Sequence, residues 1–239
     1  MVKVKICGIT NLEDAYLCIE NGVDFLGFVT EFPVPVPWNL TRKKARWMIE
    51  KLRDKVLTVV VTSGTVEEIF EIANFTRPQI LQLHGKESLN DIKELVKRLT
   101  PIGIKIIKAL PIQIDTKKAF FQIEEPEDAV LSIQSTGVWA ITIDSKTSEM
   151  PAGTGKVLDW TLAKRLREIT NIPFFLAGGL NPQNVEIAIK EVKPFGVDVI
   201  TGVEKKPGKK DPEKVRSFIK KIKESTDLAI YFPKNRHRR

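Results

Sequence analysis

A cysteine and an aspartate each follow a short apolar stretch that is typical of a buried β-strand. Cys7 follows residues 2–6, and Asp144 follows residues 140–143. In a barrel of parallel strands the C-terminal strand ends open on one rim, so a thiol and a carboxyl group there face the same space. One can remove a proton while the other donates one, which is the chemistry of proton-transfer isomerases. Without further context, a lone cysteine of this kind more often serves as a small buried hydrophobic residue. An Asp-Ser pair after a strand more often forms a turn or caps a helix.

Apolar, β-rich stretches alternate with amphipathic stretches of helical spacing along the whole sequence. The predicted strands are residues 2–6, 25–29, 57–61, 80–83, 104–107, 140–143, 174–177 and 197–200; the predicted helices are residues 12–21, 42–51, 66–74, 89–99, 161–169, 185–192 and 212–222. This alternation predicts a single-domain α/β fold, a (β/α)8 TIM barrel over residues 1–223. A doubly wound open sheet is the alternative, because periodicity does not show whether a sheet closes.

Several helix starts carry local signals. Thr10 with Glu13 and Thr65 with Glu68 have the spacing of capping boxes, and Asn181 and Asp211 each precede a proline suited to the first helical position.

Two regions interrupt the alternation of predicted strands and helices. Residues 30–39 contain three prolines and predict a stiff loop. Residues 110–138 predict a long connection with a weak helical pattern near residues 127–133.

Composition limits the function classes. The 239 residues are 42% hydrophobic and 28% charged, which suits a globular domain with a sizeable core. The two cysteines are too few for a disulfide framework and favour a cytoplasmic location. No signal peptide or membrane-spanning stretch is recognisable. The net charge of +8 is concentrated in residues 205–210 and in the basic tail expected over residues 224–239. Since no nucleic-acid-binding motif accompanies it, we expect neither nucleic acid nor membrane as a partner.

Glycine-rich turns follow the last two predicted strands. Gly178 and Gly179 come after residues 174–177, and Thr201 and Gly202 come after residues 197–200. In barrels these loops often bind phosphate through backbone N–H groups, and glycine lets the backbone approach an anion closely. The turns therefore favour a phosphorylated small-molecule ligand.

Taken in order, these motifs resemble phosphoribosylanthranilate isomerase over nearly the whole chain. The resemblance is carried by Lys5-Ile6-Cys7-Gly8-Ile9-Thr10, Leu81-Gln82-Leu83-His84-Gly85, Ile143-Asp144-Ser145, Gly153-Thr154-Gly155-Lys156, Ala177-Gly178-Gly179-Leu180-Asn181-Pro182, Val197-Asp198-Val199, Gly202-Val203-Glu204 and Pro207-Gly208-Lys209-Lys210-Asp211. It implies a TIM barrel without cofactor or metal that acts in tryptophan biosynthesis. The implied reaction is the Amadori rearrangement of N-(5-phosphoribosyl)anthranilate to 1-(2-carboxyphenylamino)-1-deoxyribulose 5-phosphate.

The resemblance also implies roles for residues. Asp144 would be the general acid at the ribose ring oxygen, and Cys7 the general base at carbon 2. Phosphate would bind at the turns holding Gly178, Gly179, Thr201 and Gly202. Lys5, Gln82, Trp38 and Arg42 are candidates for lining the substrate pocket. By its position and pattern, His84 is expected to be structural and Cys18 to lie in the core. The chain is expected to be a monomer or a homodimer.

The sequence departs from the family pattern in two places. The family's loop after the second strand normally carries an arginine for the anthranilate carboxylate, and Trp38 stands about where it is expected. Ile200 and Thr201 stand where the family tends to have two serines. Two alternatives therefore stay open beside the isomerase: a divergent paralogue acting on another phosphorylated sugar, and a non-catalytic barrel that binds a phosphorylated metabolite.

Overall fold

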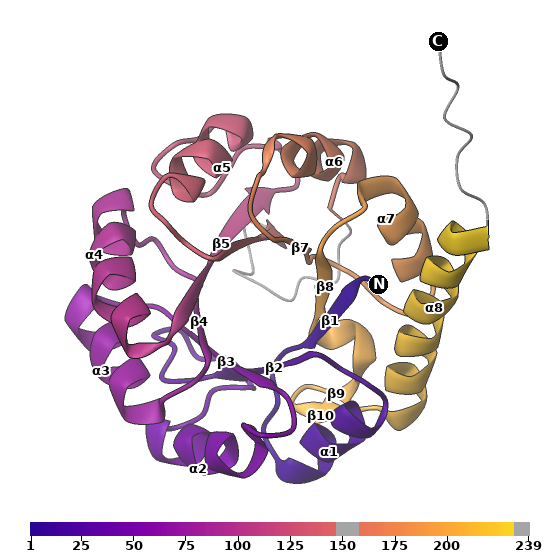
Figure 1. The fold of residues 1–239 in the computed structure, drawn as a ribbon, viewed down its shortest axis with the longest axis horizontal. Helices are drawn as coiled ribbons and strands as arrows, with labels where there is room; N and C mark the ends of the chain where they lie inside the picture. The colour runs from indigo at the N-terminus through magenta and orange to yellow at the C-terminus, as the bar shows by residue number, and fades with distance from the viewer. Residues whose placement is uncertain (147–157, 232–239) are drawn as a thin grey trace.

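The computed structural model describes residues 1–146 and 158–231, and within them eight parallel strands close into a barrel surrounded by helices (Figure 1). The barrel strands are β1 (Lys3–Ile6), β2 (Phe25–Val29), β3 (Leu57–Thr62), β4 (Ile80–Leu83), β5 (Lys105–Gln113), β6 (Ala140–Lys146), β7 (Phe174–Leu176) and β8 (Gly196–Val199). They are hydrogen-bonded in chain order, and β8 returns to pair with β1. The expected TIM barrel is confirmed.

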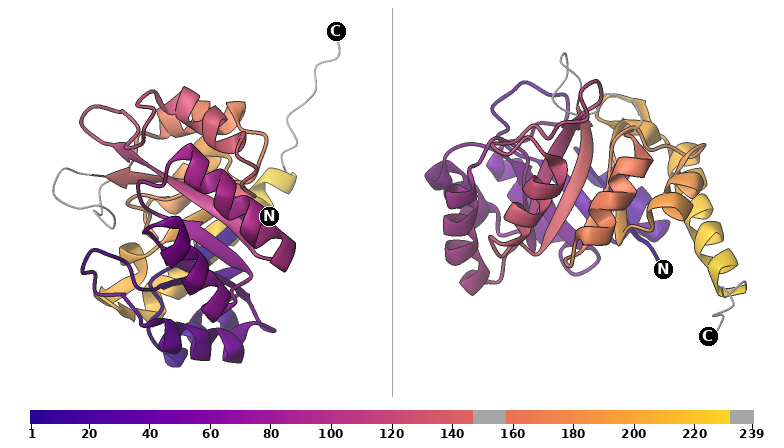
Figure 2. Two further views of the ribbon diagram at one scale, coloured as in Figure 1. Left: turned by 90° about the vertical axis from the view of Figure 1, so that its left-hand side faces the viewer. Right: turned by 90° about the horizontal axis from the view of Figure 1, so that it is seen from above.

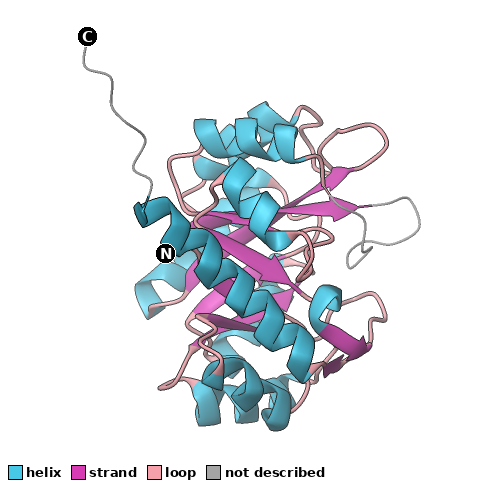
Figure 3. Ribbon diagram, turned by 90° about the vertical axis from the view of Figure 1, so that its right-hand side faces the viewer, coloured by secondary structure: helices cyan, strands magenta, loops and turns pink. Residues whose placement is uncertain are grey.

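The helices cover the outside of the barrel. They are α1 (Leu12–Glu20), α2 (Arg42–Leu52), α3 (Val66–Thr76), α4 (Leu89–Leu99), α5 (Pro126–Gln134), α6 (Trp160–Ile169), α7 (Val185–Val192) and α8 (Pro212–Tyr231), with short 3-10 turns η1 (Thr100–Ile102) and η2 (Thr201–Val203). The long helix α8 faces the viewer in Figure 3. It ends at Tyr231 and so includes residues 224–231, which we expected to belong to the tail; residues 232–239 lie outside the described part. No helix among the described residues is long and apolar enough to cross a membrane.

A small hairpin that the sequence analysis did not predict follows β8. Its strands β9 (Glu204–Lys206) and β10 (Lys209–Lys210) pair antiparallel. Figure 2 shows this hairpin beside the loop between β2 and α2, on the end of the barrel away from the N-terminus. It contacts α1 through Lys209, whose Nζ lies 2.9 Å from Asp14 Oδ1, and through the Lys210 N–H, which donates to Asp14 Oδ2 at 3.0 Å.

The long connection predicted over residues 110–138 is shorter in the structure. β5 continues to Gln113, and the weak helical pattern near residues 127–133 corresponds to the helix α5, which spans residues 126–134. The strand runs past Pro111 and beyond the predicted end at residue 107, although β4 stops at Leu83, opposite Lys108. Beyond Lys108, β5 pairs with β6 and forms an isolated antiparallel bridge at Ile112 with Ala119. The Pro111 carbonyl accepts from the Phe120 N–H at 2.8 Å, and the N–H that proline lacks is not needed for a ladder with β4, so proline is tolerated here.

Two of the four predicted helix caps are correct. Thr65 and Glu68 form the expected capping box, and the Asp211 side chain accepts from the N–H groups of Glu213 and Lys214. The other two were misplaced. Asn11, rather than Thr10, caps α1, and α7 begins after Asn184, three residues beyond Asn181. The Asn11 side chain accepts from the Asp14 N–H, so asparagine takes the cap position that the sequence analysis gave to threonine. Asn184 precedes α7 without a capping hydrogen bond from its side chain.

The core has two parts, one between strands and helices and one inside the barrel. The inner cluster includes Phe25, Val59, Ile107 and Phe175, and Cys7 belongs to it as the residue that follows the C-terminal end of β1. On β1, Val4 and Ile6 belong to the outer layer, so Lys5 and Cys7 point inward. Strand alternation thus delivers a charged and a nucleophilic side chain to the barrel interior.

Candidate active site

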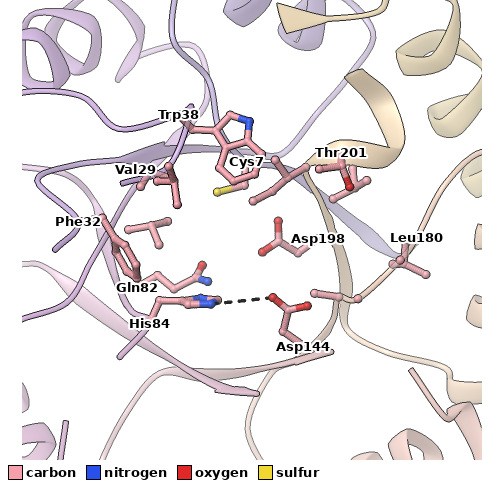
Figure 4. Close-up of a pocket in the computed structure, with 17 residues that line it drawn as sticks. Cys7, Val29, Phe32, Trp38, Gln82, His84, Asp144, Leu180, Asp198 and Thr201 are labelled. Carbon is pink, nitrogen blue, oxygen red and sulfur yellow. Dashed lines mark ion pairs between the residues drawn. The ribbon is translucent and has the colours of Figure 1, made fainter. Parts of the chain in front are cut away.

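A cavity opens at the C-terminal ends of the strands, where the catalytic residues of TIM barrels lie (Figure 4). It encloses about 720 Å³, including its open mouth. The lining residues come from β1 to β4 and β6 to β8 and from the loops that follow them: Cys7, Val29, Phe32, Val36, Trp38, Val61, Gln82, His84, Asp144, Ala177, Gly178, Gly179, Leu180, Asp198, Val199, Ile200 and Thr201. Cys7 and Asp144, distant in sequence, therefore share one space as predicted.

Cys7 lies directly after β1, fully buried, and its N–H donates to Val199 O at 2.9 Å. Gly27 on the neighbouring strand makes room for the thiol, because a Cβ at that position would lie 2.5 Å from Cys7 Sγ. Burial raises the pKa of the Cys7 thiol, Lys5 opposes this rise, and Asp198 adds to it. The thiol is thus held firmly and is a strong base once ionised.

Asp144 follows Ile143 on β6, and one of its oxygens accepts from the Ser145 N–H at 2.7 Å. Burial, followed by the nearby charge of Asp198, raises the pKa of the Asp144 carboxyl to about 7. The Ser145 N–H and Lys5 act in the opposite direction. A carboxyl group with this pKa is half protonated near neutral pH and can serve as a general acid.

The raised pKa of Asp144 predicts that its replacement stabilises the fold at alkaline pH. Between pH 4 and pH 7 the folded state keeps a proton that the unfolded state releases, so the free energy of unfolding falls as pH rises through this window. Asp144→Asn removes this penalty and keeps an acceptor for Ser145. We expect it to raise the free energy of unfolding by up to ~4 kcal/mol at pH 8 and by little at pH 4.

Urea denaturation at both pH values measures this difference. Asp115→Asn, at an exposed position, serves as the control. Equal effects of Asp144→Asn at pH 4 and pH 8 would contradict the assignment of a buried, protonated carboxyl group.

A buried ion pair lies under the cavity floor. Lys5 Nζ donates to Asp198 Oδ2 at 2.6 Å, and the side chains are 0% and 7% exposed. The second carboxylate oxygen, Oδ1, is buried at the cavity without a hydrogen-bond partner among the described residues. Lys5 itself does not line the cavity, contrary to expectation, because Asp198 covers it. Its charge still acts on both Cys7 and Asp144.

The glycine turns meet at one side of the cavity. Gly178, Gly179 and Thr201 line it as expected. Gly178 has φ +86°, and a Cβ there would lie 2.8 Å from the Ser145 N, so no other residue fits without a shift. Gly202 does not line the cavity. It packs so closely on Leu180 that a Cβ would collide with the carbonyl oxygen, and its role is to bring the two loops together.

Gln82 and His84 lie on the cavity side facing Asp144 (Figure 4). Gln82 is 2% exposed, and its Oε1 has no hydrogen-bond partner among the described residues. His84, which we expected to be structural, lines the cavity; its Nε2 lies 4.0 Å from Asp144 Oδ2, and its ring contacts Phe32 edge-on. Cys18 lies in the core as expected, and burial raises its pKa to about 12.

The loop between β2 and α2 supplies an apolar wall. Phe32, Val36 and Trp38 all line the cavity. Arg42, a predicted pocket residue, does not line it. Its guanidinium is held outside by Glu31, with Nη2 2.7 Å from Oε2, so it does not take the place of the arginine that the family pattern expects.

The sequence analysis assigned no role to Asp198, Glu204 or Lys210. Asp198 alternates with Val197 and Val199, and this pattern of a charged residue inside an apolar strand was the available signal. Glu204 and Lys210 form a second buried ion pair, at 3.0 Å, beside Trp38. Nothing in the local sequence of the lysine-rich hairpin indicated that one lysine is buried.

Comparison with known proteins places the chain in a family. The model of the N-(5'phosphoribosyl)anthranilate (PRA) isomerase family matches residues 4–221. The chain is 41% identical to N-(5'-phosphoribosyl)anthranilate isomerase of Aquifex aeolicus, over 93% of this chain and 99% of that protein. It is 38% identical to the enzyme of Methanocaldococcus jannaschii, over 93% and 97%. The crystal structure of the Thermotoga maritima phosphoribosyl anthranilate isomerase superposes with a TM-score of 0.79 at 36% identity, covering 94% of this chain and all of that chain. The chain therefore belongs to the N-(5'-phosphoribosyl)anthranilate isomerase family, a family of intramolecular isomerases.

Proposed function

We propose that the chain catalyses the Amadori rearrangement of N-(5-phosphoribosyl)anthranilate, with Asp144 as general acid and Cys7 as general base. The observation that carries the proposal is the shared cavity. In it, a fully buried thiol and a carboxyl group with a pKa of about 7 lie at the C-terminal ends of two different strands of one barrel. A similar solved structure, 34% identical with a TM-score of 0.75, is a phosphoribosyl anthranilate isomerase in complex with reduced 1-(o-carboxyphenylamino)-1-deoxyribulose 5-phosphate.

In the first step, Asp144 donates its proton to the ribose ring oxygen. The anilino nitrogen supplies the electron pair as the bond between carbon 1 and the ring oxygen breaks, and a protonated imine forms. Burial favours this step, since it keeps the carboxyl group protonated near neutral pH.

In the second step, the Cys7 thiolate removes the proton from carbon 2 and an enolamine forms. As the enolamine becomes the ketone, a proton enters carbon 1 and the proton of the carbon 2 hydroxyl leaves, so the reaction has no net proton change. Lys5 favours the thiolate, because its ammonium charge lowers the pKa of Cys7 against the effect of burial.

The cavity also offers groups that would position the substrate. The turns at Gly178, Gly179 and Thr201 would hold the phosphate through backbone N–H groups and a hydroxyl. The unpartnered oxygens of Asp198 and Gln82 would accept hydrogen bonds from sugar hydroxyls, which removes the cost of leaving them buried and unpaired.

A turnover assay over a range of pH tests the proposal. Loss of N-(5-phosphoribosyl)anthranilate is followed by its fluorescence, and we expect catalysis well above the spontaneous rate. Below pH 7 both Cys7 and Asp144 carry protons, so Cys7 cannot act as a base. At pH values far above 9.0, the ordinary cysteine pKa, both groups have lost their protons, so Asp144 cannot act as an acid. Between these limits the pair holds one proton, and a constant fraction is the active thiolate with a carboxylic acid.

The value of kcat/KM is therefore expected to rise up to about pH 7, to stay level, and to fall above pH 9. A rate equal to the spontaneous one would refute the proposed function. A rate that is highest at pH 5 and falls through pH 7 would show that Cys7 is not the base.

A further inference from the structure

Part of the cavity lining is an apolar wall. Val29, Phe32 and Trp38 point toward the cavity (Figure 4), and Val36 and Ile200 also line it. His84 packs edge-on against Phe32, and the carboxyl groups of Asp144 and Asp198 also border the cavity. The largest surface in the wall is the indole of Trp38, which lies over Gly8 and next to Cys7. A Cβ added at Gly8 would lie 2.7 Å from Trp38 Cδ1.

The indole of Trp38 is fixed in place and offers no polar atom to the cavity. Its nitrogen points away from the cavity (Figure 4) and donates to Glu204 Oε1 at 2.7 Å. The same oxygen accepts from Lys210 Nζ at 3.0 Å and from the Gly208 N–H at 3.2 Å. Trp38, Glu204 and Lys210 are 7%, 6% and 1% exposed. The hairpin thus holds the ring in a single orientation.

The charges around the cavity do not favour a second anion beside the phosphate. The described lining residues include two aspartates, no lysine and no arginine. His84 is the one described lining residue that can become a cation, and its Nε2 already lies 4.0 Å from Asp144. Lys5 and Lys210 are held away from the cavity by Asp198 and Glu204. A carboxylate on the substrate's aromatic ring would meet an apolar wall, where an unpaired charge is costly to bury.

We propose that Trp38, positioned by Glu204 and Lys210, is a specificity-determining residue that recognises the aromatic ring of the substrate and does not recognise its carboxylate. The enzyme then accepts N-aryl phosphoribosylamines without an ortho-carboxylate at least as well as the anthranilate derivative. This inference rests on the proposed function, because it concerns the same cavity and the same rearrangement. Its chemical basis is an uncharged aromatic face that packs on an uncharged aromatic ring.

The test compares two substrates that differ only in the carboxylate. N-(5-phosphoribosyl)anthranilate and N-(5-phosphoribosyl)aniline are each prepared from ribose 5-phosphate and the free amine. For the wild-type enzyme, kcat/KM for the aniline derivative is expected to equal or exceed that for the anthranilate derivative. Trp38→Ala is expected to lower both values by a similar factor, about tenfold or more. Trp38→Phe, which keeps an aromatic face, should lower them less, and Trp47→Phe, at a half-exposed position on α2, should change neither.

Two results would overturn the inference. One is a preference of more than tenfold for the anthranilate derivative, and the other is a Trp38→Ala variant that loses activity on that derivative alone. Either result would show that residues of this cavity recognise the carboxylate of the substrate.

A binding measurement keeps this test separate from the test of catalysis. The two reduced products, 1-(o-carboxyphenylamino)- and 1-phenylamino-1-deoxyribulose 5-phosphate, are titrated by calorimetry into the wild-type protein and the Trp38→Ala variant. If neither substrate turns over, the proposed function is wrong, and the ratio of the two dissociation constants still decides the inference. Tighter binding of the carboxylated product by more than tenfold would overturn it.

Discussion

Replacing Cys7 by alanine or Asp144 by asparagine is expected to lower kcat/KM by about a thousandfold, within the range that a single positioned acid or base contributes. The two groups are proposed to act in successive steps, so the loss of either one alone is sufficient to slow turnover. Cys7→Ala removes the proposed base for the carbon 2 proton, and Asp144→Asn leaves the shape of the site while removing the transferable proton. Steady-state fluorescence with purified variants measures the effect.

The second cysteine provides a matched control. Cys18→Ala deletes a thiol on α1 that belongs to the core and does not line the cavity, and activity per folded molecule is expected to stay at the wild-type value. Circular dichroism shows whether each variant is folded. A Cys7→Ala enzyme that keeps more than a tenth of the wild-type kcat/KM would rule out Cys7 as the base.

The largest effect on stability is expected from Lys108, a residue outside the cavity. Lys108 Nζ donates to Glu87 Oε2 at 2.7 Å and to Gly85 O at 2.8 Å, and the paired side chains are 0% and 1% exposed. Burial lowers the pKa of Lys108, although Glu87 opposes the shift. Lys108→Met leaves the Glu87 charge buried without its partner, which is expected to cost about 3–5 kcal/mol of unfolding free energy.

A double variant separates the pair from the packing around it. In Lys108→Met with Glu87→Gln the stranded charge is gone, so part of the lost stability is expected to return. Lys118→Met breaks an exposed pair with Glu124 and is expected to change stability by less than about 1 kcal/mol. Urea denaturation at pH 7 gives all three values. Equal losses for Lys108→Met and Lys118→Met would show that burial does not govern the strength of the pair.

Sequence reasoning could predict the barrel because most of its signals are local. Strand and helix periods, the capping box at Thr65 and the cap at Asp211 depend on neighbouring residues, and α4 and α7 have the predicted bounds. The errors arose where tertiary context decides. Pro111 lies inside β5 because the adjacent strand has already ended, and the two-residue strand β10 is too short to leave a periodic pattern.

The candidate site was predictable where a residue's position at a strand end is sufficient. Cys7 and Asp144 met this condition, as did Gly178 and Gly179. Asp198 was assigned no role, because its partner Lys5 is 193 positions away and the two meet only when β8 pairs with β1. Trp38 was noted as a departure from the family, but its contact with Glu204, 166 positions away, is a property of the closed barrel.

The proposed role of Trp38 makes substrate choice depend on the hairpin formed by β9 and β10, a segment to which no catalytic group is assigned. The β2–α2 loop presents Trp38, but the carboxylate that satisfies its indole nitrogen belongs to the hairpin, which is in turn anchored to α1 through Asp14. An engineer who transfers the loop alone into a related barrel would bury an indole N–H without an acceptor. We therefore expect the loop and the hairpin to form one transferable unit, so that an exchange of specificity between relatives requires moving both.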